Sequence, residues 1–268
     1  MANRGSARRV PPVGVHTIDT GTCELVQDGD RWTVLINGVP SSSINLANPH
    51  QLDFGYMRWI AALAETRWST PEPLKMLHLG AGACTLPRYL AATFPASRHV
   101  AVEVDARLAT LVREWFDLPK APLLRIRAGE ARQVAEELHP ASRDLVVRDV
   151  FAGDATPYAL TTVEFAAHVK RILKPGGVFA VNSGSLDDPR GWRDEIATLG
   201  GSFATLAVVG EAAVLRGRRQ GNVVVAVSDS PLPSQEFARR IHKSPVPMTV
   251  LFGDEARALG SFARHDRP

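Results

Sequence analysis

The sequence predicts an α/β fold: a mostly parallel sheet with an antiparallel last strand, covered by helices on both faces and preceded by a small N-terminal β domain. From about residue 74 to residue 200, short apolar runs alternate with segments whose apolar residues recur at helical spacing. Such alternation is typical of consecutive βαβ units and a parallel sheet. Two late apolar runs, 203–209 and 222–227, are joined by a short polar stretch that leaves no room for a helix. We therefore expect these two strands to pair antiparallel.

The bulk composition limits the class of protein. The chain has 268 residues, of which 45% are hydrophobic, enough for one large domain with a full core. The net charge of +3 is too small to indicate a nucleic-acid partner. The two cysteines, Cys23 and Cys84, have no metal-ligand spacing, and we expect no metal. The sequence contains neither a signal-peptide pattern nor an apolar run of membrane-spanning length, which favours a cytoplasmic protein without a membrane partner.

Changes in composition divide the chain into four parts. Residues 1–12 are expected to be a flexible tail and residues 13–50 a small β-hairpin domain. The α/β domain would then span 51–230, and a Pro-rich, irregular segment would follow at 231–268.

The N-terminal region carries two turn signals. Asp28-Gly29-Asp30 separates two apolar runs and predicts a hairpin, and Asn37-Gly38 predicts a second turn. The serine run at 41–43 predicts a loop. Farther on, apolar residues from Tyr56 to Leu63 recur at helical spacing, and the Pro-rich stretch 69–73 ends the predicted helix.

Five buried strands are expected in the α/β domain, at 74–79, 99–104, 123–126, 144–147 and 178–181. Helices are expected between them, and a further one around Trp192 to Leu199. Thr161 and Glu164 have capping-box spacing at the start of the fourth of these helices.

A small-residue turn, Gly80-Ala81-Gly82, follows the first of these strands. Small residues allow backbone N–H groups to approach a ligand closely. The next strand ends in Glu103 and Val104, and a carboxylate there can accept hydrogen bonds from two ribose hydroxyls. Because Thr85 stands where a dinucleotide fingerprint has its third glycine, the pattern favours a cofactor with a single adenosine. A tight turn that binds no ligand is the alternative.

Three further acids end or follow strands. Asp105 is expected to cap the following helix. Glu130, after Gly129, either accepts from the exocyclic amine of adenine or is an ordinary acid in the first turn of a helix. Asp149 ends the fourth strand, at the centre of such a sheet, where it can hold an acceptor amine and help to remove its proton. Alternatively, Asp149 pairs with Arg148 or caps a loop.

The histidines indicate no metal site. His78 lies within a predicted buried strand and is expected to be a core residue with satisfied hydrogen bonds. His50, His139 and His168 show no metal-ligand spacing.

From about Leu35 to Val227 the sequence resembles the spermidine synthase family of aminopropyltransferases, and more closely its spermidine-synthase-like branch. The motifs that carry the resemblance are Leu35-Ile36-Asn37-Gly38-Val39, Phe54-Gly55-Tyr56, Leu77-His78-Leu79-Gly80-Ala81-Gly82, Val102-Glu103-Val104-Asp105, Gly129-Glu130-Ala131, Asp144-Leu145-Val146-Val147-Arg148-Asp149, Leu173-Lys174-Pro175-Gly176-Gly177 and Gly221-Asn222-Val223-Val224. The resemblance implies a Rossmann-like class I methyltransferase fold after a small β domain. It also implies decarboxylated S-adenosylmethionine as donor, a small-molecule amine as acceptor, and a homodimer.

The resemblance also assigns site residues. Asp149 matches the catalytic acid of the family, and Tyr56 matches the tyrosine of its F-x-Y element. Glu103 matches the acid that binds ribose, and Glu130 stands where an aspartate usually reads adenine. Asp154 is the acid that follows the catalytic one, displaced along the loop.

Departures from the family pattern keep two other functions open. Ala83 replaces an acid of the glycine turn, Ser41 replaces a glutamine, and Arg58 replaces an acid, where it would repel a polycationic acceptor. A methyltransferase that uses intact S-adenosylmethionine is one alternative, with Arg58 or Arg88 as candidate partners of the donor carboxylate. The other is a non-catalytic relative that binds a nucleoside or a protein.

Overall fold

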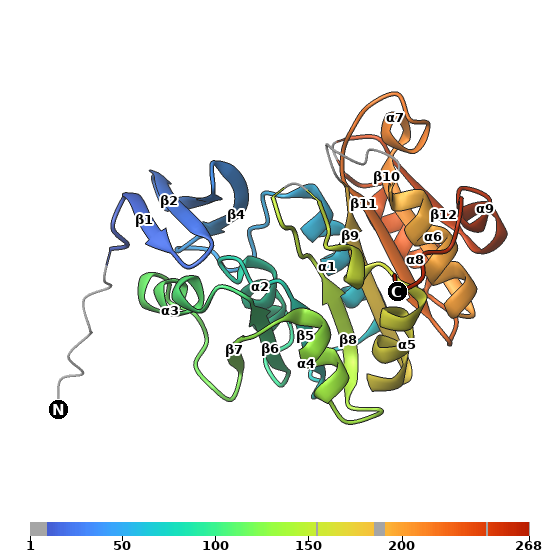
Figure 1. Cartoon of the computed structure of the whole chain (residues 1–268), viewed down its shortest axis with the longest axis horizontal. Helices are drawn as coiled ribbons and strands as arrows, with labels where there is room; N and C mark the ends of the chain where they lie inside the picture. Colours follow the sequence, from blue (N-terminus) through green and yellow to red (C-terminus); the bar gives the residue numbers. More distant parts are fainter. Residues whose placement is uncertain (1–9, 154, 185–190, 245, 268) are drawn as a thin grey trace.

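The computed structural model describes residues 10–153, 155–184, 191–244 and 246–267. The chain begins with a four-stranded antiparallel sheet in the order β1-β2-β3-β4 (Figure 1). Its strands are β1 (Gly14–Ile18), β2 (Gly21–Asp28), β3 (Arg31–Ile36) and β4 (Val39–Asn45). The predicted hairpin is confirmed, with β2 and β3 paired around the turn at Gly29.

The second predicted turn is also present, because Asn37 and Gly38 have positive φ angles between β3 and β4. The expectation of a loop at 41–43 is wrong. These serines lie within β4, and Ser42 and Ser43 are buried.

The second sheet has eight strands in the order β12-β10-β11-β9-β8-β5-β6-β7. Its strands are β5 (Lys75–Leu79), β6 (Arg98–Glu103), β7 (Leu124–Ala128), β8 (Arg143–Arg148), β9 (Leu173–Ser183), β10 (Thr205–Glu211), β11 (Val223–Ser228) and β12 (Met248–Phe252). Strands β5 to β9 are parallel, whereas β11 is antiparallel to both β9 and β10. The predicted α/β fold, with its mostly parallel sheet and antiparallel late pair, is confirmed.

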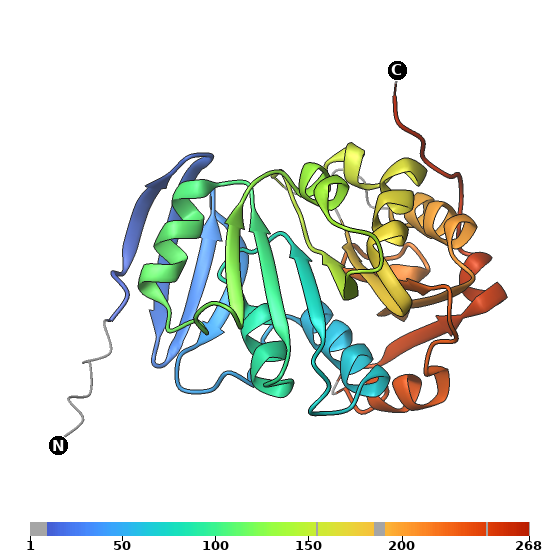
Figure 2. The same cartoon turned by 90° about the horizontal axis from the view of Figure 1, so that it is seen from below.

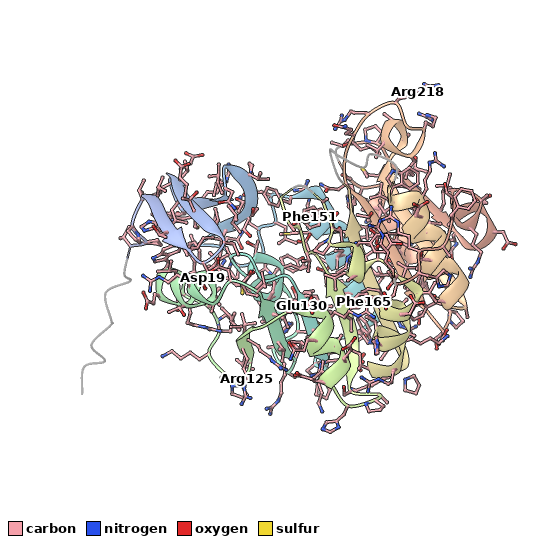
Figure 3. All side chains as sticks on the ribbon, viewed as in Figure 1. Asp19, Arg125, Glu130, Phe151, Phe165 and Arg218 are labelled. Atoms are coloured by element: carbon pink, nitrogen blue, oxygen red, sulfur yellow. The ribbon has the colours of Figure 1, made fainter. Side chains whose placement is uncertain are left out.

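Helices cover both faces of this sheet (Figure 2). They are α1 (Gly55–Arg67), α2 (Thr85–Thr93), α3 (Ala106–Trp115), α4 (Ala131–Glu137), α5 (Val163–Ile172), α6 (Gly191–Ser202), α7 (Ala212–Leu215), α8 (Ser234–Ile241) and α9 (Gly253–Arg257), with a 3₁₀ turn η1 (Tyr158–Leu160). Buried residues of α4, α5 and α6 form one core with Leu77 and Leu79 of β5. Those of α1, α2 and α8 form a second core with Met76 on the opposite face of that strand. The period-2 alternation of β5 thus produces two apolar layers. Phe165 of α5 lies in the interior, whereas Arg125 and Arg218 lie at the periphery (Figure 3).

Three further expectations about elements are wrong. A short helix, α7, lies between β10 and β11, where we expected none. The segment after Ser230 is not irregular, because it contains α8, β12 and α9, and β12 extends the sheet at its edge. The N-cap of α5 is Thr162, whose side chain accepts from the backbone N–H of Phe165, one residue later than expected.

Direct hydrogen bonds attach the N-terminal sheet to the α/β unit. Ser42 Oγ accepts from the N–H of Ala83 at 3.0 Å, and Thr85 Oγ1 donates to the carbonyl of Ser43 at 3.0 Å. Arg88 donates to the carbonyls of Asn45 and Leu46. These contacts fix β4 over the start of α2, beside the carboxyl ends of the parallel strands.

Candidate active site

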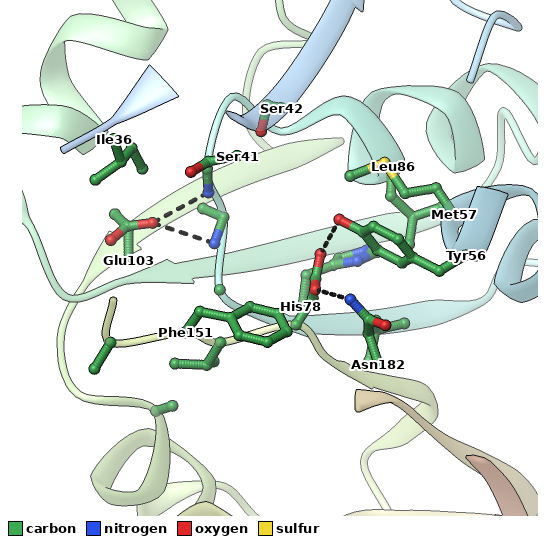
Figure 4. Close-up of a pocket in the computed structure, with 18 of the residues that line it drawn as sticks. Ile36, Ser41, Ser42, Tyr56, Met57, His78, Leu86, Glu103, Phe151 and Asn182 are labelled. Atoms are coloured by element: carbon green, nitrogen blue, oxygen red, sulfur yellow. Dashed lines mark hydrogen bonds between the residues drawn. The ribbon is translucent and has the colours of Figure 1, made fainter. Parts of the chain in front are cut away.

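A cavity of about 640 Å³ lies at the carboxyl edge of the parallel strands, between them and the N-terminal sheet (Figure 4). Ligands of open α/β sheets bind at this edge. Polar or titratable side chains that line it are those of Ser41, Ser42, Tyr56, His78, Thr85, Glu103, Glu130, Asp149, Asn182, Gln220 and Asn222. The predicted residues Gly80, Ala81, Gly82, Val104 and Gly129 line it too. Asp154 lies outside the described residues.

The glycine turn positions the carboxylate of Glu103. The backbone N–H groups of Ala81 and Gly82 donate to Glu103 Oε2 at 3.3 and 3.1 Å, and that of Asp105 donates to Oε1 at 3.2 Å. Burial raises the pKa of Glu103, and these three hydrogen bonds oppose the increase. The amides of the turn therefore hold the carboxylate that we expected to bind ribose, rather than being directed at a ligand themselves.

Close approach of other backbone and side-chain atoms explains the two glycines of this turn. Gly80 has a φ angle of +88°, and a Cβ atom there would lie 2.1 Å from the carbonyl oxygen of Asp149. At Gly82 a Cβ atom would lie 2.6 Å from Ser42 Oγ. The turn therefore needs glycine to fit between the end of β8 and the N-terminal sheet.

Asp149 is held from two sides. Tyr56 of α1 donates its hydroxyl to Asp149 Oδ2 at 2.7 Å, and Asn182 of β9 donates through Nδ2 to Oδ1 at 2.9 Å (Figure 4). Burial raises the pKa of Asp149, and these hydrogen bonds lower it in part. Burial raises the pKa of Tyr56 as well, and the Asp149 carboxylate raises it further, so the phenol stays a hydrogen-bond donor. The sequence placed Tyr56 and Asp149 in one site, and they are in contact.

Arg148 does not pair with Asp149, which removes one alternative for that acid. Its guanidinium is buried and forms an ion pair with Glu195 of α6 at 2.7 Å. It also donates to the carbonyls of Leu160 and Asn182. This buried pair joins β8, β9, α6 and η1 behind the cavity.

The two remaining acids are helix caps. Asp105 accepts from the N–H of Leu108 at the start of α3, as expected, and also from Thr20 of the N-terminal region. Glu130 accepts from the N–H groups of Arg132 and Gln133 at the start of α4. Glu130 therefore meets one of the two expectations held for it, and contact with adenine stays a prediction.

Neither candidate partner for a donor carboxylate is in place. Arg88 is buried and bonded to β4 and the residue after it, as described above. Arg58 donates to the carbonyls of Leu52 and Asp53 and lines a second cavity, of about 530 Å³, on the far side of α1. The expected repulsion between Arg58 and a cationic acceptor therefore does not arise in the main cavity.

The electrostatic character of the main cavity is acidic. Glu103, Glu130 and Asp149 line it, and no lysine or arginine does so among the described residues. No group of three or more His, Cys, Asp or Glu side chains in the described ranges is arranged to hold a metal ion. No helix of the described chain is long and apolar enough to cross a bilayer.

His78 is buried, as expected, but it is not fully satisfied. Its Nε2 lies 3.1 Å from Nδ1 of His99, while its own Nδ1 has no hydrogen-bond partner among the described residues. Asn182 was not singled out from the sequence, because a lone Asn in an apolar run carries no motif. Its contribution depends on β9 lying beside β8.

Fold and cavity together define an α/β protein with an acid-lined site at the carboxyl edge of its sheet, the place where proteins of this class bind nucleosides. No family model matches the sequence. The crystal structure of a probable spermidine synthase from Corynebacterium glutamicum superimposes on this chain with a TM-score of 0.90, and the two sequences are 41% identical. The match covers 97% of this chain and 98% of that one. The chain belongs to the spermidine synthase family.

Curated relatives are more distant. A polyamine aminopropyltransferase from Chromobacterium violaceum is 28% identical over 59% of this chain and 60% of its own length. An eEF1A lysine and N-terminal methyltransferase from Bos taurus is 30% identical over 46% of this chain and 19% of its own length. Three aminopropyltransferases match this chain over only 38%, 60% and 30% of their own lengths.

Proposed function

We propose that the protein transfers an aminopropyl group from decarboxylated S-adenosylmethionine to a small amine. The acidic lining of the main cavity carries this proposal. Loss of the carboxylate leaves the donor with a free ammonium group and a sulfonium, and both are cations that a carboxylate-lined site stabilises. Intact S-adenosylmethionine carries a carboxylate beside the same ammonium, and the described lining offers that carboxylate no cationic partner. Membership of the spermidine synthase family supports the same reaction.

The reaction needs positioning more than chemical activation. The acceptor nitrogen uses its lone pair to form a bond to the propyl carbon that is attached to sulfur. The carbon–sulfur bond breaks, and its electron pair stays on sulfur, so that methylthioadenosine leaves as a neutral thioether. The one proton that the acceptor ammonium loses before its nitrogen attacks passes to the carboxylate of Asp149 or to water. Holding the two reactants in line supplies most of the acceleration.

We assign each site residue a function in this reaction. Glu103 accepts hydrogen bonds from the ribose hydroxyls, beside Val104. Gly129 and Glu130 are assigned to the adenine, and the turn Gly80-Ala81-Gly82 holds Glu103 in place through the amides of Ala81 and Gly82. Asp149 orients the acceptor amine, and Tyr56 fixes that carboxylate. Asp154 is proposed as a second acid near the acceptor.

Methyl transfer from intact S-adenosylmethionine is the second candidate. The observation that favours it is the similarity to an eEF1A methyltransferase. The identity to that protein is 30% over 46% of this chain, and the identity to an aminopropyltransferase is 28% over 59% of this chain. It predicts S-adenosylhomocysteine as the product rather than methylthioadenosine.

A product assay distinguishes the two reactions. The protein is incubated with butane-1,4-diamine and either donor, and the nucleoside product is identified by mass spectrometry. We expect methylthioadenosine from the decarboxylated donor, and little product from the intact one. The Asp149→Asn variant should abolish turnover while nucleoside binding stays within about tenfold, because this acid acts on the acceptor. Formation of S-adenosylhomocysteine, or full activity of Asp149→Asn, would contradict the proposal.

We also propose that the protein is a cytoplasmic homodimer. Strand β1 is an edge strand that pairs with β2 alone among the described strands, and Val15 on it is exposed. Cys23 and Cys84 are buried free thiols, as expected in a reducing compartment. Light scattering of the purified protein tests the dimer, and a monomeric mass would contradict it.

A further inference from the structure

We infer that His78 and Asn182 complete a subsite that selects a primary amine as the acceptor. This inference rests on the proposed function, since it concerns the amine that the reaction consumes. Two buried hydrogen-bond acceptors, His78 Nδ1 and Asn182 Oδ1, have no partner among the described residues. They belong to the strands on either side of β8, the strand that Asp149 follows.

A chain of hydrogen bonds fixes the tautomer of His78. Ser97 Oγ lies 2.5 Å from the carbonyl oxygen of Phe94, and a carbonyl can only accept, so the single hydroxyl proton of Ser97 lies between them. His99 Nε2 lies 2.6 Å from the same Oγ and must therefore carry the proton of that contact. Burial lowers the pKa of His99 to about 4, so the ring is neutral and its Nδ1 is unprotonated.

His78 is the next member of the chain. Its Nε2 lies 3.1 Å from the unprotonated Nδ1 of His99 and therefore donates its proton there. Burial and the neighbouring ring lower the pKa of His78 well below its usual value, so this imidazole is neutral too. His78 Nδ1 is consequently a bare lone pair, an acceptor fixed by contacts that end at Phe94.

That lone pair is directed toward the catalytic acid. The two nitrogens of an imidazole point in strongly diverging directions. Because Nε2 faces His99 on β6, Nδ1 is turned toward the opposite neighbour of β5, which is β8. Figure 4 shows the ring of His78 beside the carboxylate that Tyr56 and Asn182 bind. Both His78 and Asn182 line the main cavity.

Asn182 is the counterpart on the other side. Its side chain is buried, and its Nδ2 donates to Asp149, which fixes the amide so that Oδ1 is the free acceptor. The pairing of Val181 with Arg148 places Asn182 level with Asp149. Asp149 therefore lies between two neutral acceptors, one on each adjacent strand.

Three acceptors match the three N–H donors with which a primary ammonium group binds, before one proton passes to Asp149 or to water and frees the lone pair that attacks. An unpaired buried acceptor costs about 1–3 kcal/mol, and a ligand that donates to it recovers part of that cost. The ammonium of a secondary amine has only two N–H bonds and carries an alkyl group in place of the third. It would leave one acceptor unpaired and would place a methyl group against it. The subsite therefore favours primary over secondary amines.

Calorimetry on the protein saturated with methylthioadenosine tests this inference. We expect butane-1,4-diamine to bind about tenfold more tightly than its N,N′-dimethyl derivative, which corresponds to about 1.4 kcal/mol. In His78→Leu the affinity for the primary diamine should fall about tenfold, and most of the preference should disappear. His139→Leu, at a position outside the cavity, should behave as wild type. Methylthioadenosine affinity should change less than about twofold in both variants.

Unchanged diamine affinity or preference in His78→Leu would overturn the subsite, as would failure of the wild-type protein to bind either amine. If His78→Leu does not fold, ¹⁵N NMR of the wild-type protein decides. The His78 Nδ1 resonance should have the shift of an unprotonated ring nitrogen and should move when the diamine is added, and an unmoved resonance would overturn the inference.

Diamine binding without methylthioadenosine production would refute aminopropyl transfer and leave the subsite standing. Methylthioadenosine production together with unchanged diamine affinity in His78→Leu would refute the subsite and leave aminopropyl transfer standing.

Discussion

The hydroxyl of Tyr56 donates a hydrogen bond to Asp149 and acts on the pKa of that carboxyl group. Burial raises the pKa of Asp149, while the hydrogen bond from Tyr56 lowers it. Because the reaction needs the carboxylate, activity should fall as pH decreases through this raised pKa. In Tyr56→Phe the stabilising hydrogen bond is lost, so the acidic limb of the profile of kcat/KM against pH should move to higher pH.

Tyr158→Phe is the matched control, because the Tyr158 hydroxyl donates to the carbonyl of His265. The acidic limb of the pH profile of Tyr158→Phe should lie at the same pH as that of the wild-type protein. An unmoved limb in Tyr56→Phe would show that this hydrogen bond does not act on the group that titrates.

Glu103 should determine nucleoside affinity. The Glu103→Gln variant keeps one oxygen but turns an NH₂ group toward backbone N–H donors that now bind the carboxylate. We expect methylthioadenosine to bind about ten- to a hundredfold more weakly by calorimetry, since charge-assisted hydrogen bonds to ribose are lost. Glu114→Gln, on the exposed side of α3, serves as the control. Equal affinities for the two variants would remove Glu103 from the ribose site.

The acids of the site could be predicted from the sequence, because their positions in the chain are enough to find them. Glu103 and Asp149 end or follow apolar runs, and the ends of parallel strands converge at one edge. Asn182 and the free nitrogen of His78 were not predicted, because their significance depends on neighbours that are distant in sequence. Arg88 was placed wrongly for the same reason, since it donates to the backbone carbonyls of Asn45 and Leu46. Arg58 was also placed wrongly, although the carbonyls that it binds, those of Leu52 and Asp53, are near in sequence.

At the level of elements, the turn after β5 is sterically constrained. Gly80→Ala would introduce both the strain of a positive φ angle and a contact with the carbonyl of Asp149. Gly29→Ala would introduce only the strain, because no atom lies within 4 Å of the position of its Cβ. We expect Gly29→Ala to cost about 1 kcal/mol of unfolding free energy and Gly80→Ala clearly more, with loss of nucleoside binding. Equal melting temperatures for the two variants would contradict this account of the turn.

Elements with strong periodicity were predicted correctly, whereas short or small-residue elements were not. The serines at 41–43 indicated a loop because their side chains are small and polar, yet they are in β4 and contact the start of α2. The four residues of α7 are too few to show a helical period. The C-terminal strand β12 is stabilised by pairing with β10, which no local pattern predicts.

At the scale of the whole molecule, the buried pair of Arg148 and Glu195 joins strands β8 and β9 to helix α6. Arg148→Met leaves Glu195 as an unpaired buried charge, and we expect a loss of about 3–5 kcal/mol in the free energy of unfolding. The double variant Arg148→Met/Glu195→Met removes both charges and should recover most of that loss. Urea denaturation of the two proteins measures the difference. A double variant less stable than the single one would show that the charges contribute more than their mutual neutralisation.

The central claim is that this cavity is built for a donor without a carboxylate. Calorimetric titration of the purified protein with decarboxylated and with intact S-adenosylmethionine tests it most directly. We predict that the decarboxylated donor binds at least about tenfold more tightly, because its ammonium meets acids where a carboxylate would be repelled. Tighter binding of intact S-adenosylmethionine would contradict the account.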